Sequence, residues 1–333
     1  MATRRSGLLI TLGLAALAAL AALLLFLALP HKSPPPEVAF RFQYHIFRNS
    51  AADLDDIVQA LKPFSIPGDS FVIRGDTTMA VPDWNVVRAQ INRLKQNFPQ
   101  NKIYFQGSGW TRMREVITVM PNDVLQSVEG IMVKYEPQNE EQYGPYPPQG
   151  PHFFPYVLQQ YTELSQLATS RGTQLWAIPS GRYIKGFGNE GDRGWDYGQI
   201  GAVVHRVVIQ TQGACRIQHD PGNPRHNVNF YGGAFDELNQ QFTNAGVTQA
   251  SRHWIDMLAV GAEGDAFNNL TPEQSFECVK IAEAHGAHEH APQWGNNNTS
   301  AMVRLLQLRQ AALNSSPIRP VAQRQNALAW MRR

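Results

Sequence analysis

From residue 38 onward, short runs of β-branched and aromatic residues alternate with segments in which apolar residues recur every three or four positions. The first pattern is typical of strands and the second of amphipathic helices. Regular alternation of the two predicts repeated βα units around a parallel sheet. The predicted strands lie at 38–47, 70–74, 102–105, 130–135, 174–178, 203–211 and 257–260.

The helical patterns fill the intervals between these strands, at 53–61, 82–99, 157–168, 235–242, 271–284 and 301–313. The helix at 271–284 has the clearest start, because Thr271, Pro272 and Gln274 supply an N-cap, a proline at the first helical position and a capping-box glutamine. An eighth strand is expected between Gly286 and Trp294, although the pattern there is poor. The expected fold class is therefore α/β, a (β/α)8 TIM barrel.

An uncharged apolar segment precedes the predicted barrel. Residues 7–29 are Leu, Ala, Ile, Phe, Gly and one Thr, enough to cross a hydrocarbon core of about 30 Å at about 1.5 Å per residue. Arg4 and Arg5 before it favour a cytoplasmic N-terminus. A cleaved signal peptide is the alternative, but the apolar core is long for one and the exit at 28–30 is a poor cleavage site. We expect a single transmembrane helix at 1–30, which places the protein in the cell membrane.

The rest of the chain is expected to form one extracytoplasmic domain. Residues 31–37 contain three prolines and predict a short semi-rigid linker. The barrel is assigned to 38–315, since α/β barrels commonly run about 250 residues as a unit. A basic C-terminal tail follows at 316–333.

Charge and cysteine content narrow the classes of partner and site. The formal net charge is +2, and no Lys/Arg block interleaves with aromatics, so the sequence does not predict a nucleic-acid surface. Cys215 and Cys278 lie far apart without CxxC spacing, which argues against a zinc cluster. They could form one disulfide or stay as two buried thiols. Nucleotide-binding glycine motifs are absent from the sequence, and no cofactor is expected.

The strongest chemical signal follows the predicted strand at 130–135. Active sites of TIM barrels lie at the C-terminal ends of the strands, and Glu136 comes directly after this strand. Strand alternation places Met132, Lys134 and Glu136 on one face. If that face is the barrel interior, Glu136 stands at the mouth as a candidate general acid. The alternative is a rim glutamate that caps a helix or pairs with an arginine.

Residues 129–136, E-G-I-M-V-K-Y-E, resemble the strand-four signature of family 18 glycoside hydrolases, D-G-x-D-x-D-x-E. Gly130 and Glu136 occupy the matching glycine and catalytic-acid positions, whereas Met132 and Lys134 stand at the two inner Asp positions. Residues 102–110 and 209–212 are loosely similar to the third-strand and sixth-strand motifs of the same family. The resemblance implies a divergent, chitinase-like TIM barrel.

The departures from the signature change the chemistry that the resemblance implies. In that family the Asp two residues before the Glu orients the N-acetyl group that attacks the anomeric carbon, and Lys134 cannot accept that hydrogen bond. A sugar-cleaving site here would therefore need a second carboxylate as nucleophile or base. Glu263, after the predicted strand at 257–260, is the candidate, and the pair resembles the two glutamates of the large retaining glycosidase clan. The alternative is that Glu263 belongs to a glycine-rich turn.

Further polar and aromatic residues fall at or near strand ends and are candidates for binding sugar hydroxyls or stacking on pyranose rings. Each could equally be a rim or packing residue. They are Lys134, Tyr135, Asp76, Gln106, Trp110, Gln210, Gln212 and Trp294.

These observations predict a membrane-anchored, extracytoplasmic glycoside hydrolase-like protein acting on a polysaccharide, with Glu136 and Glu263 as the catalytic pair. The first alternative is a non-catalytic carbohydrate-binding barrel, because both inner Asp positions are lost. The second is a metal-dependent hydrolase that uses His285, His288 and His290, although their spacing does not match the HExxH pattern of zinc hydrolases.

Overall fold

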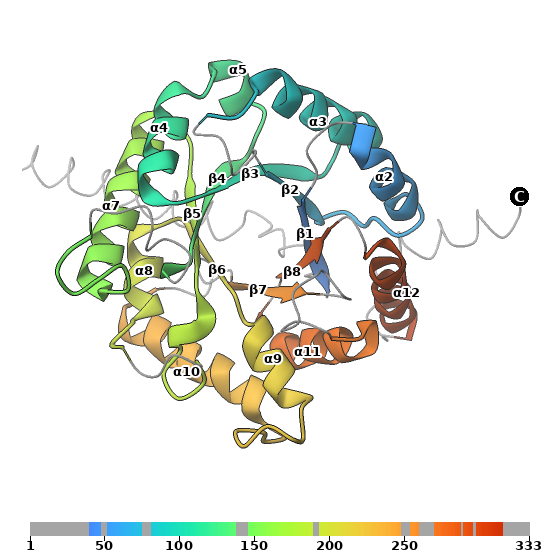
Figure 1. The fold of residues 1–333 in the computed structure, drawn as a ribbon. Coiled ribbons are helices and arrows are strands. Elements are labelled where there is room, and N and C mark those ends of the chain that lie inside the picture. The colour runs from blue at the N-terminus through green and yellow to red at the C-terminus, as the bar shows by residue number, and fades with distance from the viewer. Residues whose placement is uncertain are drawn as a thin grey trace, which may run out of the picture. The chain divides into compact units, whose positions relative to one another are not determined.

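Eight parallel strands close into a barrel in which each strand pairs with the next and β8 pairs with β1 (Figure 1). The strands are β1 (Arg41–Ile46), β2 (Ser70–Arg74), β3 (Lys102–Ser108), β4 (Gly130–Tyr135), β5 (Leu175–Pro179), β6 (Arg206–Ile209), β7 (Trp254–Ala259) and β8 (Glu289–Trp294). The predicted (β/α)8 architecture is confirmed. The closing strand, β8, lies in the interval where the sequence pattern was poor. Its pairing with the free edge of β1 closes the barrel.

The computed structural model describes residues 40–47, 52–74, 81–137, 146–188, 193–247, 254–259, 270–287, 289–295 and 298–315, with the backbone alone for 254–259. The expected anchor at 1–30, the linker at 31–37 and the tail at 316–333 lie outside these residues, as do Asp76, Glu263 and His288. Within the described ranges, the helices are all too short or too polar to span a membrane.

Helices form a ring around the barrel (Figure 1). They are α2 (Asp55–Leu61), α3 (Trp84–Asn97), α4 (Trp110–Val119), α5 (Asn122–Leu125), α7 (Phe154–Ser170), α8 (Tyr197–Val203), α9 (Gln212–Gln218), α10 (Phe230–Asn244), α11 (Pro272–Ala284) and α12 (Thr299–Ser315). Two short 3-10 helices, η1 (Ala52–Leu54) and η3 (Gly181–Tyr183), lie in the connections. The six predicted helices are present, and α4, α5, α8 and α9 are additional.

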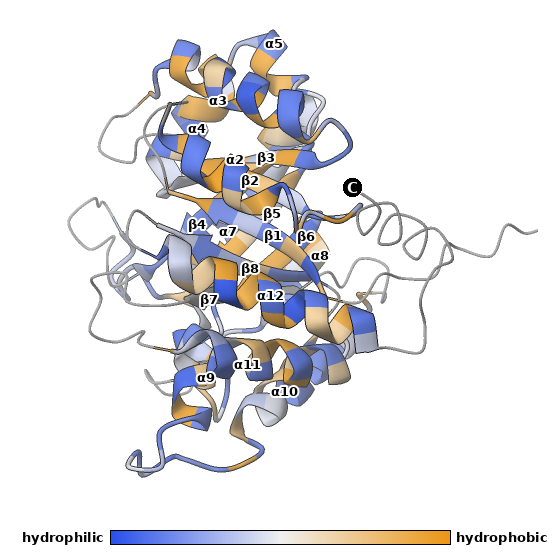
Figure 2. Cartoon of the chain, turned by 90° about the vertical axis from the view of Figure 1, so that its right-hand side faces the viewer, coloured by the Kyte–Doolittle hydropathy of each residue, from blue (hydrophilic) through white to orange (hydrophobic). Residues whose placement is uncertain are grey.

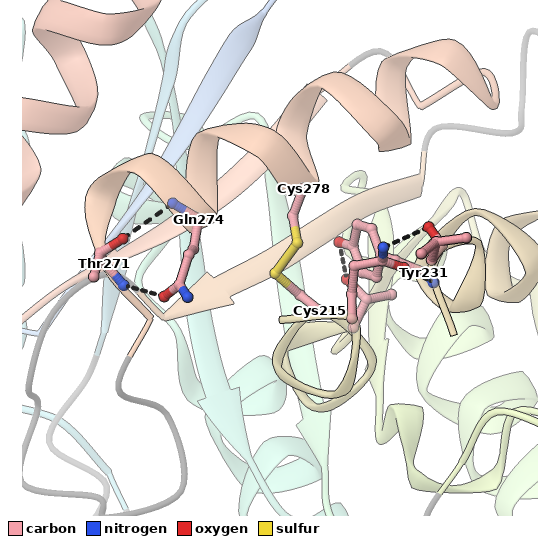
Figure 3. The surroundings of a disulfide bond; sticks show 8 residues. Cys215, Tyr231, Thr271, Gln274 and Cys278 are labelled. Carbon is pink, nitrogen blue, oxygen red and sulfur yellow. Dashed lines mark hydrogen bonds between the residues drawn. A yellow bond between two sulfur atoms is a disulfide. The ribbon is translucent and has the colours of Figure 1, made fainter. Parts of the chain in front are cut away.

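Side-chain N-caps mark the starts of α11 and α3. The capping box of α11 forms as expected: the Thr271 hydroxyl accepts from the Gln274 amide at 3.1 Å, and the Gln274 side chain accepts from the Thr271 amide at 3.0 Å (Figure 3). At α3, the Asp83 carboxylate accepts from the Asn85 amide at 2.9 Å. Each cap satisfies backbone donors that have no partner within the first turn.

Strand alternation divides the hydrophobic side chains into two layers. Residues that point outward pack against the helices, which carry both hydrophobic and hydrophilic stretches (Figure 2). Residues that point inward fill the barrel, as in other TIM barrels. The inner cluster consists of Val72, Tyr104, Met132, Trp176, Ile178, Val208 and Ala291. Beneath the mouth, the barrel is therefore a packed core.

A buried charge cluster occupies the N-terminal end of the barrel. Glu289 lies 3.7 Å from Arg41 and 3.8 Å from Arg206, and the Arg206 guanidinium lies 4.8 Å from the centre of the Trp176 ring. Burial raises the pKa of Glu289, while the two arginines oppose that shift. Groups at this end of a TIM barrel generally serve stability, whereas catalytic and binding residues lie at the opposite end.

The two cysteines form a disulfide that joins two helices of the ring. Cys215 on α9 and Cys278 on α11 are fully buried, with sulfurs 2.01 Å apart and Cα atoms 6.0 Å apart (Figure 3). Of the two alternatives that the sequence left open, the structure shows the disulfide. It ties together two segments separated by 63 residues.

Candidate active site

The end of β4 brings together the two charged residues that the sequence placed on one face. Met132 belongs to the inner cluster, so Lys134 and Glu136, two and four residues further on, share its face. The Nζ of Lys134 lies 2.9 Å from Oε2 of Glu136, and both side chains are largely buried. The predicted position of Glu136 at the mouth is therefore accompanied by an ion pair with Lys134, a residue of the strand that precedes it.

A buried histidine lies next to this pair. His45, on the inner face of β1, has Nδ1 2.8 Å from Oε1 of Gln106 and Nε2 3.0 Å from Oε1 of Gln43. The pKa of His45 is lowered to about 3, chiefly by burial; the Gln106 hydrogen bond opposes this shift, and the nearby charges of Lys134 and Arg74 add smaller lowering effects. His45 is therefore neutral at physiological pH.

Neutrality constrains the two glutamines that flank His45. A neutral imidazole donates from one nitrogen and accepts at the other, so two amide oxygens cannot both face it as acceptors. One of the amides of Gln43 and Gln106 must turn its nitrogen towards the ring, an exchange that leaves the heavy-atom positions almost unchanged. The two glutamines together then present one donor and one acceptor away from the ring.

A second cation lies at the end of the neighbouring strand. Arg74 is the last residue of β2 and pairs in register with Gln106 on β3. Its guanidinium lies 4.9 Å from the centre of the Phe47 ring, which is the contact expected of a cation with an aromatic face. Arg74 stands two residues after Val72 and Lys134 two residues after Met132, both members of the inner cluster, so the two cations lie on the inner face of the sheet.

Buried amides complete the polar surface of this end. Gln106 is 1% exposed and Gln210, after β6, is 7% exposed. Among the described residues, the amide atom of Gln106 that points away from His45 and the side-chain nitrogen of Gln210 have no hydrogen-bond partner, and the same holds for Oε1 of Gln212 at the start of α9. A buried polar group without a protein partner is costly unless water or a ligand satisfies it. These amides, predicted from the sequence, are therefore candidate ligand contacts.

The aromatic residues predicted to contact a sugar pack between the sheet and the helices. Tyr135 stacks on Trp110 with ring centres 4.0 Å apart, and its hydroxyl donates to the Pro151 carbonyl at 2.6 Å. Trp294 is fully buried and donates to the Thr299 hydroxyl at 3.2 Å. All three rings belong to the layer between the sheet and the helices. The structure thus places Tyr135, Trp110 and Trp294 in the packing between the sheet and the helices, and their contact with a sugar stays a prediction.

Two predicted acidic residues lie outside the described residues. These are Asp76, after β2, and Glu263, after β7. The pairing of Glu136 with Glu263 therefore stays a prediction.

The candidate metal ligands do not form a cluster in the described part of the chain. His285 Nδ1 lies 2.7 Å from the Asp236 carboxylate, whereas His290 is fully buried with Nε2 3.3 Å from the Glu283 carboxylate. A different group, Cys215, His219 and Cys278, has its donor atoms within 4.8 Å of one another. The two sulfurs are bonded to each other, so they are not available as thiolate ligands.

His45, Gln43 and Arg74 were not predicted as site residues from the sequence. Arg41, Gln43 and His45 alternate with aromatic residues in the first strand, and that spacing already predicts polar side chains on one face. Three polar side chains facing inward from one strand of a barrel indicate either a charge cluster or a site. The register of β1 with β2 shows which end each of them approaches.

No protein-family model and no curated protein sequence matches the chain. Several solved structures match the chain in fold. The Group IV chitinase of Ostrinia furnacalis superposes with a TM-score of 0.52 at 10% identity, covering 83% of this chain and 100% of that one. A GH18 chitinase from Pseudoalteromonas aurantia gives 0.50 at 11%, covering 80% and 99%. At such identities the likeness is one of fold: the chain has a divergent, chitinase-like TIM barrel.

Proposed function

We propose that this barrel binds a polysaccharide at its mouth and cleaves it, with Glu136 as the acid/base residue and Glu263 as the partner carboxylate. The observation that carries the proposal is the position of Glu136, on the inner face directly after β4 at the C-terminal end of a chitinase-like barrel. Carboxylates at that end of the strands are suited to proton transfer at a glycosidic oxygen.

The ion pair with Lys134 bears on the role that Glu136 would take. The ion pair between Nζ of Lys134 and Oε2 of Glu136, at 2.9 Å, orients the carboxylate that would act on the sugar. Met132 and Lys134 provide no carboxylate to assist an N-acetyl group, so the second carboxylate must come from another strand. A separation of about 5 to 5.5 Å between the two carboxyl groups would predict retention of configuration, and about 6.5 to 9.5 Å inversion.

A non-catalytic carbohydrate-binding barrel is the second candidate. The same ion pair favours it, because a carboxylate engaged by Lys134 on its own strand can be a structural and ligand-binding group without moving a proton. A non-catalytic barrel would bind a glycan without cleaving it.

We also propose that the protein acts at the cell membrane, on its extracytoplasmic side. The apolar segment at 7–29 supports an anchor. The disulfide between Cys215 and Cys278 supports an oxidising compartment, since disulfides persist mainly outside the cytosol. The substrate would then be a polysaccharide of the envelope or its surroundings.

The test compares Glu136→Gln with Glu129→Gln, both assayed for release of reducing sugar from a panel of polysaccharides. Glu129 precedes the same strand at its other end, where it is exposed and pairs with Lys102 at 2.7 Å. Loss of an acid/base group should lower kcat by about 100-fold or more, whereas Glu129→Gln should match the parent.

Three other outcomes separate the candidates. A Glu136→Gln variant that keeps the full rate of an active parent would refute the catalytic assignment. A parent that binds a glycan in calorimetry but releases no sugar would favour the non-catalytic barrel. A parent that neither binds nor cleaves any member of the panel would exclude both sugar functions.

A further inference from the structure

A cluster of metal-ligating side chains lies between two helices of the ring, outside the barrel. Cys215 and His219 belong to α9 and its C-terminal cap, and Cys278 belongs to α11. One donor atom from each, two sulfurs and an imidazole nitrogen, lie within 4.8 Å of one another. Zinc sites in proteins are commonly built from cysteine and histidine ligands of this kind.

The sequence spacing explains why His219 lies beside Cys215. The two are four residues apart, and side chains at that spacing on a helix share one face. The third residue, Cys278, comes from the buried face of α11. The helix between them in the chain, α10, packs against both α9 and α11 (Figure 1). The fold itself therefore holds the two cysteines close, and they should stay close when the bond between them is broken.

The imidazole of His219 is available to a metal. Its Nε2 is buried and has no hydrogen-bond partner among the described residues, although the ring as a whole is partly exposed. A buried polar atom without a partner is costly unless something else satisfies it. A neutral imidazole nitrogen is the commonest metal ligand among side chains. The partly exposed ring also places the cluster near solvent, which an entering ion requires.

The dimensions of the cluster suit one tetrahedral ion. Zinc binds thiolate sulfur at about 2.3 Å, so two thiolates on one ion lie about 3.8 Å apart. Cα atoms 6.0 Å apart allow that separation after rotation about the Cα–Cβ bonds. The imidazole nitrogen, within 4.8 Å of both sulfurs, has to move by only about 1 Å. Two thiolates and an imidazole favour zinc over magnesium or calcium, and water can fill the fourth position.

We propose that reduction of the Cys215–Cys278 disulfide converts this cluster into a metal site, in which both thiolates and His219 bind one Zn²⁺. A dithiol or a phosphine supplies the two electrons and becomes a disulfide or, with oxygen from water, a phosphine oxide. The S–S bond breaks and both sulfurs become thiols. Zinc binding then releases the two thiol protons. The same sulfurs serve the disulfide and the ion, so the two states exclude each other, whatever the barrel mouth binds.

Cobalt reports the proposed ligands directly, because Co²⁺ bound to thiolate absorbs in the near ultraviolet through sulfur-to-metal charge transfer. The chain contains two cysteines, so this absorption can arise from no other residues. The full-length protein in detergent is reduced with a phosphine, its two thiols are counted, and Co²⁺ is added without oxygen. We expect the band to saturate at one Co²⁺ per chain in the reduced protein and to be absent from the disulfide form.

Zinc should then displace the cobalt and abolish the band, since thiolate ligands favour zinc. Oxidation tests whether the two states exclude each other. Diamide takes up two electrons and, with two protons from solvent, becomes a hydrazine, while the S–S bond forms again and Zn²⁺ leaves. We expect one zinc ion to be released for each pair of thiols lost, measured with a chromophoric chelator.

Variants assign the site to its three residues. His219→Ala should weaken Co²⁺ binding by about 100-fold or more, since even loss of an outer partner of a ligand commonly costs about 10- to 100-fold. Cys278→Ser should abolish saturable binding at the same cobalt concentrations. His205→Ala is the matched control, because His205 is also a partly buried histidine but directly precedes β6, away from the cysteines. It should bind cobalt as the parent does.

Two results would overturn the proposal. The first is a folded, reduced protein with two free thiols that gives no charge-transfer band. The second is a band that His219→Ala leaves at the parent's affinity, which would remove the imidazole from the site. Should the reduced protein lose its fold, Zn²⁺ must restore it, as circular dichroism would show. A reduced chain that zinc neither binds nor refolds overturns the proposal as well.

Discussion

The Nη1 of Arg309 on α12 lies 2.8 and 3.0 Å from the two carboxylate oxygens of Asp69, although 240 residues separate the two in sequence. Both side chains are buried. Asp69 also accepts from the Phe42 amide at 2.9 Å and from the Tyr44 hydroxyl at 3.0 Å. The carboxylate of Asp69, directly before β2, thus links α12 to β1.

Loss of the Asp69 charge should destabilise the fold strongly. Asp69→Asn leaves the Arg309 guanidinium buried without a counter-charge, which typically costs about 3 to 5 kcal/mol. We expect a loss of that size in the free energy of unfolding, measured with urea. The exposed pair of Arg88 and Asp123 provides the control, because Asp123→Asn should cost less than about 1 kcal/mol. Equal losses from the two substitutions would contradict the role given to Asp69.

His45 should make the fold less stable in mild acid. Its pKa is about 3 in the folded protein and about 6.5 in the unfolded chain. Between these values the unfolded chain binds a proton that the folded protein does not. Stability should therefore fall as the pH drops from 6.5 towards 3, by about 1.4 kcal/mol per pH unit from this group, and be unaffected by it above pH 6.5.

The variant His45→Gln isolates this contribution. Glutamine does not titrate and can still hydrogen-bond to Gln43 and Gln106. Urea unfolding at pH 7 and pH 5 should show the parent losing about 2 kcal/mol more than the variant. The other titrating groups are common to both proteins, so identical losses would show that His45 is not held neutral.

Much of the fold follows from periodicity, and the exceptions have physical causes. All eight strands overlap the predicted segments, although β7 begins three residues before its predicted segment and β6 is shorter than predicted. Two of the additional helices, α8 and α9, are seven residues long and contain glycine, a weak helix former. Gly198 in α8 is required by packing, since a Cβ there would lie 2.2 Å from the Gln241 carbonyl oxygen. Such a contact between distant residues has no local signal.

The candidate site was predictable in part. The alternation that placed Lys134 and Glu136 inside the barrel also places Tyr135 outside it, where it stacks on Trp110. Applied consistently, it would have assigned both rings to packing. The same alternation in β1 would also have indicated Gln43 and His45, which were not predicted. The sequence could not show that Lys134 and Arg74 both lie near His45, because that proximity depends on the curvature of the closed sheet.

The disulfide should contribute measurably to stability. Joining Cys215 to Cys278 restricts the unfolded chain over 63 residues, and loss of such a link commonly costs about 2 to 5 kcal/mol. Urea unfolding with and without a phosphine reductant should show this difference once two thiols have been counted in the reduced sample. The double substitution Cys215→Ser with Cys278→Ser should be less stable than the parent and indifferent to the reductant. A reduced parent with an unchanged midpoint would refute the contribution.

Closure of the barrel by β1 and β8 has a consequence for how the protein is made. During synthesis, β1 can pair with β2 early, but its other edge stays open until β8 at Glu289–Trp294 has left the ribosome. The Asp69 carboxylate likewise has no contact with Arg309 until that residue, close to the end of the described chain, has been synthesised. An incomplete nascent chain therefore exposes a sheet edge and an unmatched carboxylate for most of its synthesis. We expect chaperones to matter more for this protein than for a domain whose first elements pair locally, and early termination to yield aggregation rather than a smaller folded barrel.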